Sequence, residues 1–199
     1  MSLLYGTAVY YLIIRIINRY LNFNISEEII SNLRNLTLYF LFANLYFLAL
    51  YHVTNLYIAK HINFEFFILT SGGIYTFIFW AGQVLIGLIL PLALIMSNKF
   101  KDTIALKYAS ILVLLGGFSA MHVIIIGGQA FPLNIFPDHI ILDSAFYDNV
   151  VHSYTPSIYE FILGIGGIAL ALIIVLIGIA NFKFLPTITP PSNINTQKD

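Results

Sequence analysis

Residues 114–129 read LLGGFSAMHVIIIGGQ, and this stretch decides the fold because it is an apolar helix that ends in two glycines and an amide. A loop that opens with AFPLNIFPDH follows, and a second apolar helix begins within YTPSIYE at residues 154–160. Pro156 sets the first turn of that helix, and Glu160 places a carboxylate one turn inside it. Polar groups at the ends of apolar helices indicate a site embedded in a membrane.

The composition excludes a soluble globular domain. Of the 199 residues, 59% are hydrophobic and 9% are charged, and the mean hydropathy is +0.89. A soluble domain has about a quarter charged residues, so this chain is predicted to be an integral membrane protein. The net charge of zero gives no indication of nucleic-acid binding. The absence of cysteine excludes disulfides, thiolate-bound iron–sulfur clusters and cysteine-ligated zinc sites in this chain.

The predicted fold class is an all-α membrane protein with five transmembrane helices, the last four forming an up-down four-helix bundle. Each predicted span is about 20 residues long, enough to cross a hydrocarbon core of roughly 30 Å. Ser26 and the two acids after it predict that the second helix begins near Glu27, before its span. Residues 1–183 are expected to form the bundle and residues 184–199 a disordered cytoplasmic tail. The predicted spans are 2–20, 36–58, 72–96, 104–128 and 158–182.

The basic residues orient these helices. Eight of the nine flank the first loop, the third loop or the C-terminus, whereas Lys60 lies on the other side. The positive-inside rule therefore predicts that the N-terminus is outside and the C-terminus cytoplasmic. The loop 130–157 would then face outward, and its aspartates and aromatic residues predict a docking surface. The eight basic residues are Arg15, Arg19, Arg34, Lys99, Lys101, Lys107, Lys183 and Lys198.

Four of the helices carry polar side chains at similar predicted depth, in the outer half of the membrane. For a single Asn, Ser or Thr, the favoured explanation is an interhelical hydrogen bond, worth about 1 kcal/mol. Glu160 and the histidines are better candidates for function, because ionisable groups are costly inside a membrane. If Glu160 lies at the headgroup level, however, its carboxylate costs little there. The residues at this depth are His52, Asn55, Thr76, Gln83, His122, Gln129 and Glu160.

The residues around the fourth span resemble the C-terminal half of the NrfD/polysulfide-reductase membrane-subunit family. The matching motifs are GGFSAMHVIIIGGQAFPL at 116–133, YTPSIYE at 154–160 and KFLP at 183–186. The same pattern is matched by Phe79-Trp80, Gly87, Pro91 and LALYHVTNLY at 48–57. The resemblance covers nearly the whole chain.

This resemblance implies a membrane subunit, or half-subunit, of a quinone-linked respiratory oxidoreductase in the cytoplasmic membrane of a prokaryote. Such subunits carry no covalently bound cofactor and exchange electrons between quinone, either menaquinone or ubiquinone, and an iron–sulfur subunit on the outer face. Family members usually have eight to ten helices. A second membrane subunit is therefore expected to supply the missing N-terminal bundle. The other expected partner is lipid, and the chain is not expected to catalyse a reaction alone.

The resemblance also suggests roles for the polar residues in the outer half of the membrane. Ionisable groups would relay the proton that accompanies each electron at a quinone. The candidates for this relay are Glu160, His122 and His52. Amide and hydroxyl groups would orient hydrogen bonds to the quinone or to ordered water. The candidates for these bonds are Gln129, Gln83 and Tyr154. No metal site is predicted.

Three other functions are consistent with the sequence. A haem-b anchor would use His52 and His122, which lie on separate helices at similar predicted depth, with Gly116 and Gly117 making room for the porphyrin. A small transporter would use the polar residues as its path, although paired broken helices and repeated halves are absent from the sequence. A structural assembly subunit would have no chemistry of its own.

Overall fold

The computed structural model describes residues 1–21, 26–97, 101–131 and 154–182. The predicted tail at 184–199 and most of the predicted docking loop lie outside the described residues. The chain divides into two units, Met1–Ser153 and Tyr154–Asp199, and each has its own arrangement.

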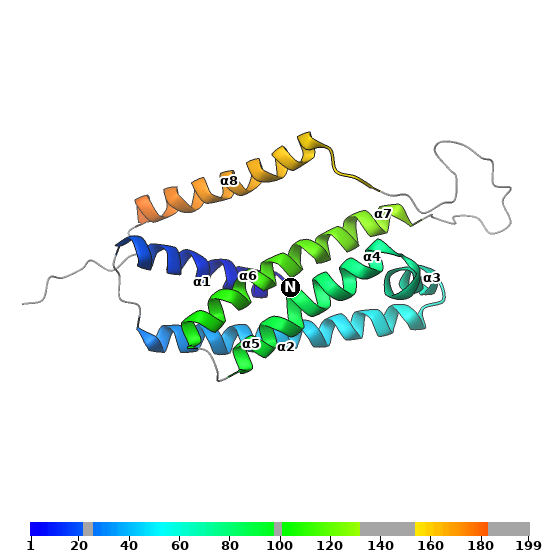
Figure 1. Cartoon of the computed structure of the whole chain (residues 1–199), viewed down its shortest axis with the longest axis horizontal. Helices are drawn as coiled ribbons and strands as arrows, with labels where there is room; N and C mark the ends of the chain where they lie inside the picture. Colours follow the sequence, from blue (N-terminus) through cyan, green and yellow to red (C-terminus); the bar gives the residue numbers. More distant parts are fainter. Residues whose placement is uncertain (22–25, 98–100, 132–153, 183–199) are drawn as a thin grey trace, which may run out of the picture. The chain divides into compact units, whose positions relative to one another are not determined.

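The described residues of the first unit form helices without strands. Its elements in chain order are α1 (Ser2–Leu21), α2 (Glu27–Tyr57), α3 (Ile62–Phe66), η1 (Phe67–Ser71), α4 (Ile74–Phe77), η2 (Ile78–Ile89), α5 (Leu90–Met96), α6 (Asp102–His122), η3 (Val123–Gly127) and α7 (Gly128–Ala130). The three elements labelled η are π-helical. α6 packs against α1, η2 and α5, and α1 also packs against α2, so the long helices lie side by side (Figure 1). α6 is therefore the central helix of this unit.

Four helical stretches of the described residues are long and apolar enough to cross a membrane. These are Glu27–Tyr57, Ile74–Met96, Asp102–Ala130 and Ile158–Gly178. The all-α class is thereby confirmed, and the protein is a multi-pass membrane protein. α1 has 20 residues but includes Arg15 and Arg19, and it is not one of the four. The span 2–20 therefore stays a prediction, as does the bundle of the last four spans, because α8 (Ile158–Phe182) belongs to the second unit.

The start of α2 follows the capping pattern predicted for it. Ser26 is the N-cap, and its hydroxyl oxygen accepts a hydrogen bond from the Glu28 N–H at 3.2 Å. Glu27 and Glu28 place negative charge in the first turn, where it interacts favourably with the helix dipole. α2 begins at Glu27, so the predicted extension of the helix before its span is confirmed.

Arg34 ties three helices together at one end of the first unit. Its guanidinium donates to the Ile95 carbonyl at 2.7 Å, and its Nε lies 3.5 Å from a carboxylate oxygen of Asp102. The early part of α2, the end of α5 and the start of α6 therefore meet at this end. This is the arrangement that alternating spans require, and it places the helix ends that flank the first and third loops at the same end of the unit, as the charge pattern predicts. Which side of the membrane this end faces stays a prediction.

A pair of glycines allows α6 and η2 to approach closely. A Cβ built on Gly116 would lie 2.0 Å from the Cα of Gly87, and one built on Gly87 would lie 2.7 Å from the Cα of Gly116. The two backbones are therefore in direct contact at this crossing. Small residues permit such contact between membrane helices.

A short apolar helix, formed by α3 and η1, connects α2 to the next span. It covers Ile62–Ser71 and is too short to cross a membrane. No helix was predicted here, because residues 59–71 fall between two predicted spans. Gly73, with φ +57°, follows it and allows the chain to turn into α4. The short helix therefore covers the end of the first unit beside α2 and η2.

Candidate functional site

A groove of about 1680 Å³ opens in the first unit. It is bordered by α2, α3, the first turn of α1 and all three π-helical segments. Its walls are mostly apolar and include the aromatic side chains of Phe47, Phe64 and Phe79. π-helical turns inside longer helices are frequent at functional sites, and a drug-sized ligand needs roughly 300–1,000 Å³. The groove is therefore large enough for an aromatic ring together with an apolar chain.

Polar side chains line the groove at one end. Lys60 and His61 come from the turn between α2 and α3, and Asn55 comes from the last turns of α2. The Nδ1 of His61 lies 3.3 Å from the amide oxygen of Asn55. Of the predicted site residues, His52 and Gln83 both line this groove. The structure thus brings one predicted proton-relay residue and one predicted hydrogen-bonding residue to the same cavity.

His52 is held by a carboxylate that sequence reasoning missed. Its Nδ1 is hydrogen-bonded to an oxygen of Glu65, which comes from the short helix α3. The Glu65 residue is 0% exposed, whereas the His52 side chain keeps 13% of its surface exposed. Phe79 packs edge-on against the imidazole, with ring centroids 4.8 Å apart. The available signal was a lone acid within the apolar run INFEFFIL at residues 62–69.

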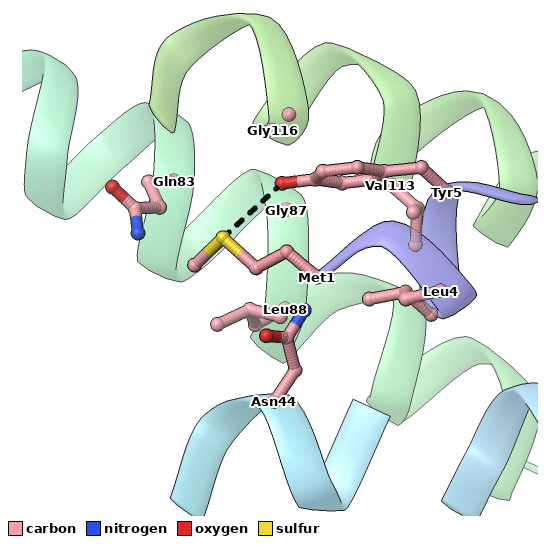
Figure 2. Close-up of a pocket in the computed structure, with 10 residues that line it drawn as sticks. Met1, Leu4, Tyr5, Asn44, Gln83, Gly87, Leu88, Val113 and Gly116 are labelled. Carbon is pink, nitrogen blue, oxygen red and sulfur yellow. Dashed lines mark hydrogen bonds between the residues drawn. The ribbon is translucent and has the colours of Figure 1, made fainter. Parts of the chain in front are cut away.

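The Gln83 amide lies deeper in the unit. Gln83 is 4% exposed and Asn44 is 7% exposed. Figure 2 shows both amides beside a small cavity, Asn44 on α2 and Gln83 on η2, with the Met1 side chain between the two helices. This cavity has a volume of about 10 Å³, close to the space that one water molecule needs. Gln83 and Asn44 both border this cavity and the groove.

Two other predicted residues lie near the end of the fourth span and are not among the lining residues of the groove. His122, the last residue of α6, stacks on Tyr75 with ring centroids 6.1 Å apart. Gln129 is exposed on the short helix α7. Neither side chain is among the residues that line the groove, although both are described. The predicted roles of both residues, and the haem alternative that joins His122 to His52, therefore stay predictions.

Glu160 and Tyr154 lie together in the second unit. Glu160 accepts hydrogen bonds from the Tyr154 hydroxyl and from the Ser157 N–H, the latter at 3.2 Å. The Ser157 hydroxyl in turn accepts from the Glu160 N–H at 3.4 Å, which completes a capping box at the start of α8. The bond to Glu160 raises the pKa of the Tyr154 hydroxyl. Glu160 thus has a helix-capping role, and the convergence of these residues with those of the first unit stays a prediction.

The comparison with known proteins identifies the family. The family described as polysulphide reductase, NrfD, matches residues 1–133 of this chain. The chain belongs to the NrfD family. The matched part of this NrfD-family chain contains every residue that lines the groove, whereas the YTPSIYE motif at 154–160 lies beyond it. The expected family membership is therefore confirmed.

A curated relative of this NrfD-family chain is the Hdr-like menaquinol oxidoreductase integral membrane subunit of Archaeoglobus fulgidus. The two sequences are 31% identical over 147 residues, which cover 71% of this chain. The same residues cover 36% of the relative, so the chain matches about a third of that protein. No solved structure matches the chain.

Proposed function

We propose that this chain is the membrane subunit, or part of the membrane subunit, of a quinone-linked oxidoreductase, and that the groove receives the quinone. The observation that carries this proposal is a mostly apolar groove with several aromatic side chains, an imidazole and an amide in its walls, in a member of the NrfD family. The relative from Archaeoglobus fulgidus is named as a subunit of a menaquinol oxidoreductase. Between the two predicted quinones, that name favours menaquinone.

The groove has the chemistry that a quinone needs. Flat rings pack against aromatic side chains, which Phe79 and Phe64 supply at its wall. The two quinone carbonyls accept hydrogen bonds, and the amide of Gln83 and the imidazole of His52 are the donors that we propose for them. The apolar end of the groove, which includes Phe40 and Leu48, suits an isoprenoid chain. A ring bound in this way has its carbonyls near His52 and Gln83.

The proton-relay residues of the proposal differ in the support that they have. His52 is in the groove wall and carries the proposed exchange of a proton with the quinone. Glu160 and His122 would extend the relay, and Gln129 and Tyr154 would orient water along it. Those four residues have other contacts or an exposed position in their own units, so their part in the relay rests on the family resemblance.

The proposal also includes partners, because electrons from a quinol need an acceptor. An iron–sulfur subunit on the outer face would supply that acceptor. A second membrane subunit would supply helices that correspond to the part of the relative outside the matched 36%. A mild-detergent purification of the tagged chain, followed by mass spectrometry, should recover both subunits. Recovery of the chain without an electron-transfer subunit would contradict this part of the proposal.

A photoreactive azidoquinone tests the groove directly. The complex purified with its partners is reconstituted in lipid nanodiscs, labelled and mapped by peptide mass spectrometry. We expect label on α2 near His52 and on η2 near Gln83. Gln83→Leu removes a hydrogen bond worth about 1 kcal/mol, so labelling at limiting quinone should fall about fivefold. Asn32→Leu, an amide change at an exposed position of α2, is the matched control.

Two results of this experiment would contradict the proposed function. Label confined to surfaces outside the groove would place the quinone elsewhere. Equal labelling of the Gln83→Leu and Asn32→Leu variants would remove the proposed amide contact. A reduced-minus-oxidised spectrum of the same preparation tests the haem alternative, because a b-type haem with two histidine ligands gives a characteristic absorption band.

A further inference from the structure

The His52–Glu65 pair carries an inference beyond the binding of quinone. Glu65 is 0% exposed, and it reaches this position only because α3 folds back against the end of α2. A carboxylate removed from water is strongly disfavoured unless it is paired, hydrogen-bonded or protonated. The contact with the Nδ1 of His52 supplies a partner for one carboxylate oxygen. The imidazole and the carboxyl group therefore share one proton position between them.

The second oxygen of Glu65 makes the pair unusual. Oε2 is buried and has no hydrogen-bond partner among the described residues. Leaving a buried acceptor unsatisfied costs about 1–3 kcal/mol, and more when the group is charged. A pair that served only to hold α3 against α2 would be expected to satisfy both oxygens. The unpartnered oxygen instead suits a carboxyl group that carries a proton during part of a reaction cycle.

His52 connects this buried carboxyl group to the groove. Its Nδ1 is occupied by Glu65, so Nε2 is the ring nitrogen that remains for a ligand. The imidazole belongs to the groove wall, whereas Glu65 does not. Phe79 packs against the ring and restricts its rotation. When Nε2 accepts a proton, the proton on Nδ1 can therefore move to Glu65.

We propose that His52 and Glu65 act as one proton-binding site for the quinol in the groove, an inference that rests on the proposed function. One quinol O–H bond breaks and an N–H bond forms at the Nε2 of His52. The proton on Nδ1 then moves to Oε1 of Glu65, so the carboxylate becomes a neutral carboxyl group. The accompanying electron leaves the quinol for a one-electron acceptor of the iron–sulfur class in a partner subunit. Glu65 is thus a positioning residue that acts through His52.

Charge balance favours this arrangement in an apolar environment. Before the transfer the pair has the single negative charge of Glu65, and afterwards it is neutral. A lone histidine would instead become a cation when it accepts the proton, which is disfavoured away from water. Titratable groups on the surrounding elements are few in the described residues. They are Lys60, His61 and the N-terminal residue Met1 at the groove, Tyr51 beside His52, and the stacked Tyr75 and His122.

The experiment compares Glu65→Gln with Glu65→Asp and with Glu28→Gln, a matched control at an exposed position near the start of α2. The complex with its partners is reconstituted in nanodiscs and assayed in three ways: azidoquinone labelling, quinol oxidation, and infrared difference spectra between quinol-loaded and quinone-loaded protein. We expect Glu65→Gln to label normally, to lose the carboxyl C=O band and to slow turnover about 100-fold. Glu65→Asp should restore the band and part of the rate, and Glu28→Gln should resemble the unmodified protein.

The outcomes separate this inference from the proposed function. In one outcome, Glu65→Gln keeps the carboxyl band and the turnover rate, and quinone still labels the groove. This result would overturn the proton-binding role and leave the groove as the quinone site. Absence of groove labelling in the unmodified protein would overturn both. If Glu65→Gln does not fold, His52→Gln and the unmodified protein decide the question. Unchanged turnover in His52→Gln, or no carboxyl band in the unmodified protein, would refute the inference.

Discussion

The crossing of α6 and η2 predicts that the smallest possible addition to Gly116 will destabilise the protein. In Gly116→Ala, the new Cβ would lie 2.0 Å from the Cα of Gly87. Nonbonded carbon atoms are most stable about 3.5–4.0 Å apart, so the overlap is roughly 1.5 Å. The atom that it meets is backbone, so a change of rotamer cannot relieve the overlap. The two helices must therefore separate by about that distance.

The expected cost follows from two opposing effects. Overpacking in a tightly packed interior costs typically about 1–3 kcal/mol, and a clash between two backbones belongs at the upper end of that range. Alanine in place of glycine stabilises a helix by up to about 1 kcal/mol, because its helix propensity is higher. The net loss for Gly116→Ala is then about 2 kcal/mol, which lowers the ratio of folded to unfolded protein about 30-fold.

The measurement is reversible unfolding in mixed micelles, with helicity followed as the denaturing detergent increases. Gly6→Ala is the matched control, because a Cβ at Gly6 on α1 meets nothing within 4 Å. We expect Gly6→Ala to be neutral or stabilising by up to about 1 kcal/mol. Gly87→Ala should destabilise less than Gly116→Ala, since its Cβ would be 2.7 Å from the facing Cα. Because the helices need to separate only once, the double variant should lose less than the sum of the two.

Two results would refute the close crossing. The first is a free energy of unfolding for Gly116→Ala that lies within about 0.5 kcal/mol of the value for Gly6→Ala. Substitutions at unconstrained surface sites have effects in that range. The second is a double variant whose loss of stability equals the sum of the losses in Gly116→Ala and Gly87→Ala. Such additivity is typical of sites that share no contact. Either result would mean that α6 and η2 are separated enough for side chains to fit between them.

Two further predictions concern the ends of helices. Gly73→Ala should lower the free energy of unfolding by about 1–2 kcal/mol in the same assay, because Gly73 has φ +57° and L-residues are strained there. An unchanged midpoint of unfolding would mean that this turn relaxes. Ser157→Ala removes the hydroxyl that accepts the Glu160 N–H and should destabilise the start of α8 by about 1 kcal/mol, seen as faster hydrogen exchange in its first turn. Exchange in the last turn is the internal control, and equal protection in both proteins would contradict the capping box.

Local signals in the sequence were sufficient to predict the long helices. The Ser26 cap and the acids after it act within one turn, so they fix the start of α2 without any tertiary contact. Hydrophobic runs of about 20 residues similarly identify membrane spans by length alone. The predicted spans 36–58, 72–96, 104–128 and 158–182 all overlap helices of sufficient length and apolarity. Properties that depend on a few neighbouring residues are therefore readable from this chain.

Properties that depend on packing between distant segments were not predictable in the same way. The π-helical turns of η2 arise without a residue pattern that distinguishes them from an α-helix. Pro91, the proline of this span, lies after them in the first turn of α5. Glu65 lies 13 residues after His52, across a turn, and no helical spacing relates the two. Only the fold of α3 against α2 brings them together. The candidate site was therefore predicted in part, through His52 and Gln83, while the partner of His52 was missed.

Two carboxylates, one in each unit, differ in how far helix capping and fold stability explain them. Glu160 is exposed in its own unit and accepts bonds from Tyr154 and Ser157. These bonds form a helix cap, which explains an S-x-x-E sequence without a ligand. Glu65 is 0% exposed, and one of its oxygens has no partner in the part of the chain that the structure describes, so its position lowers the stability of the fold. Leucine or methionine at residue 65 would avoid that cost, so the stability of the fold does not explain the acid, whereas the proposed exchange of a proton with a ligand beside His52 would.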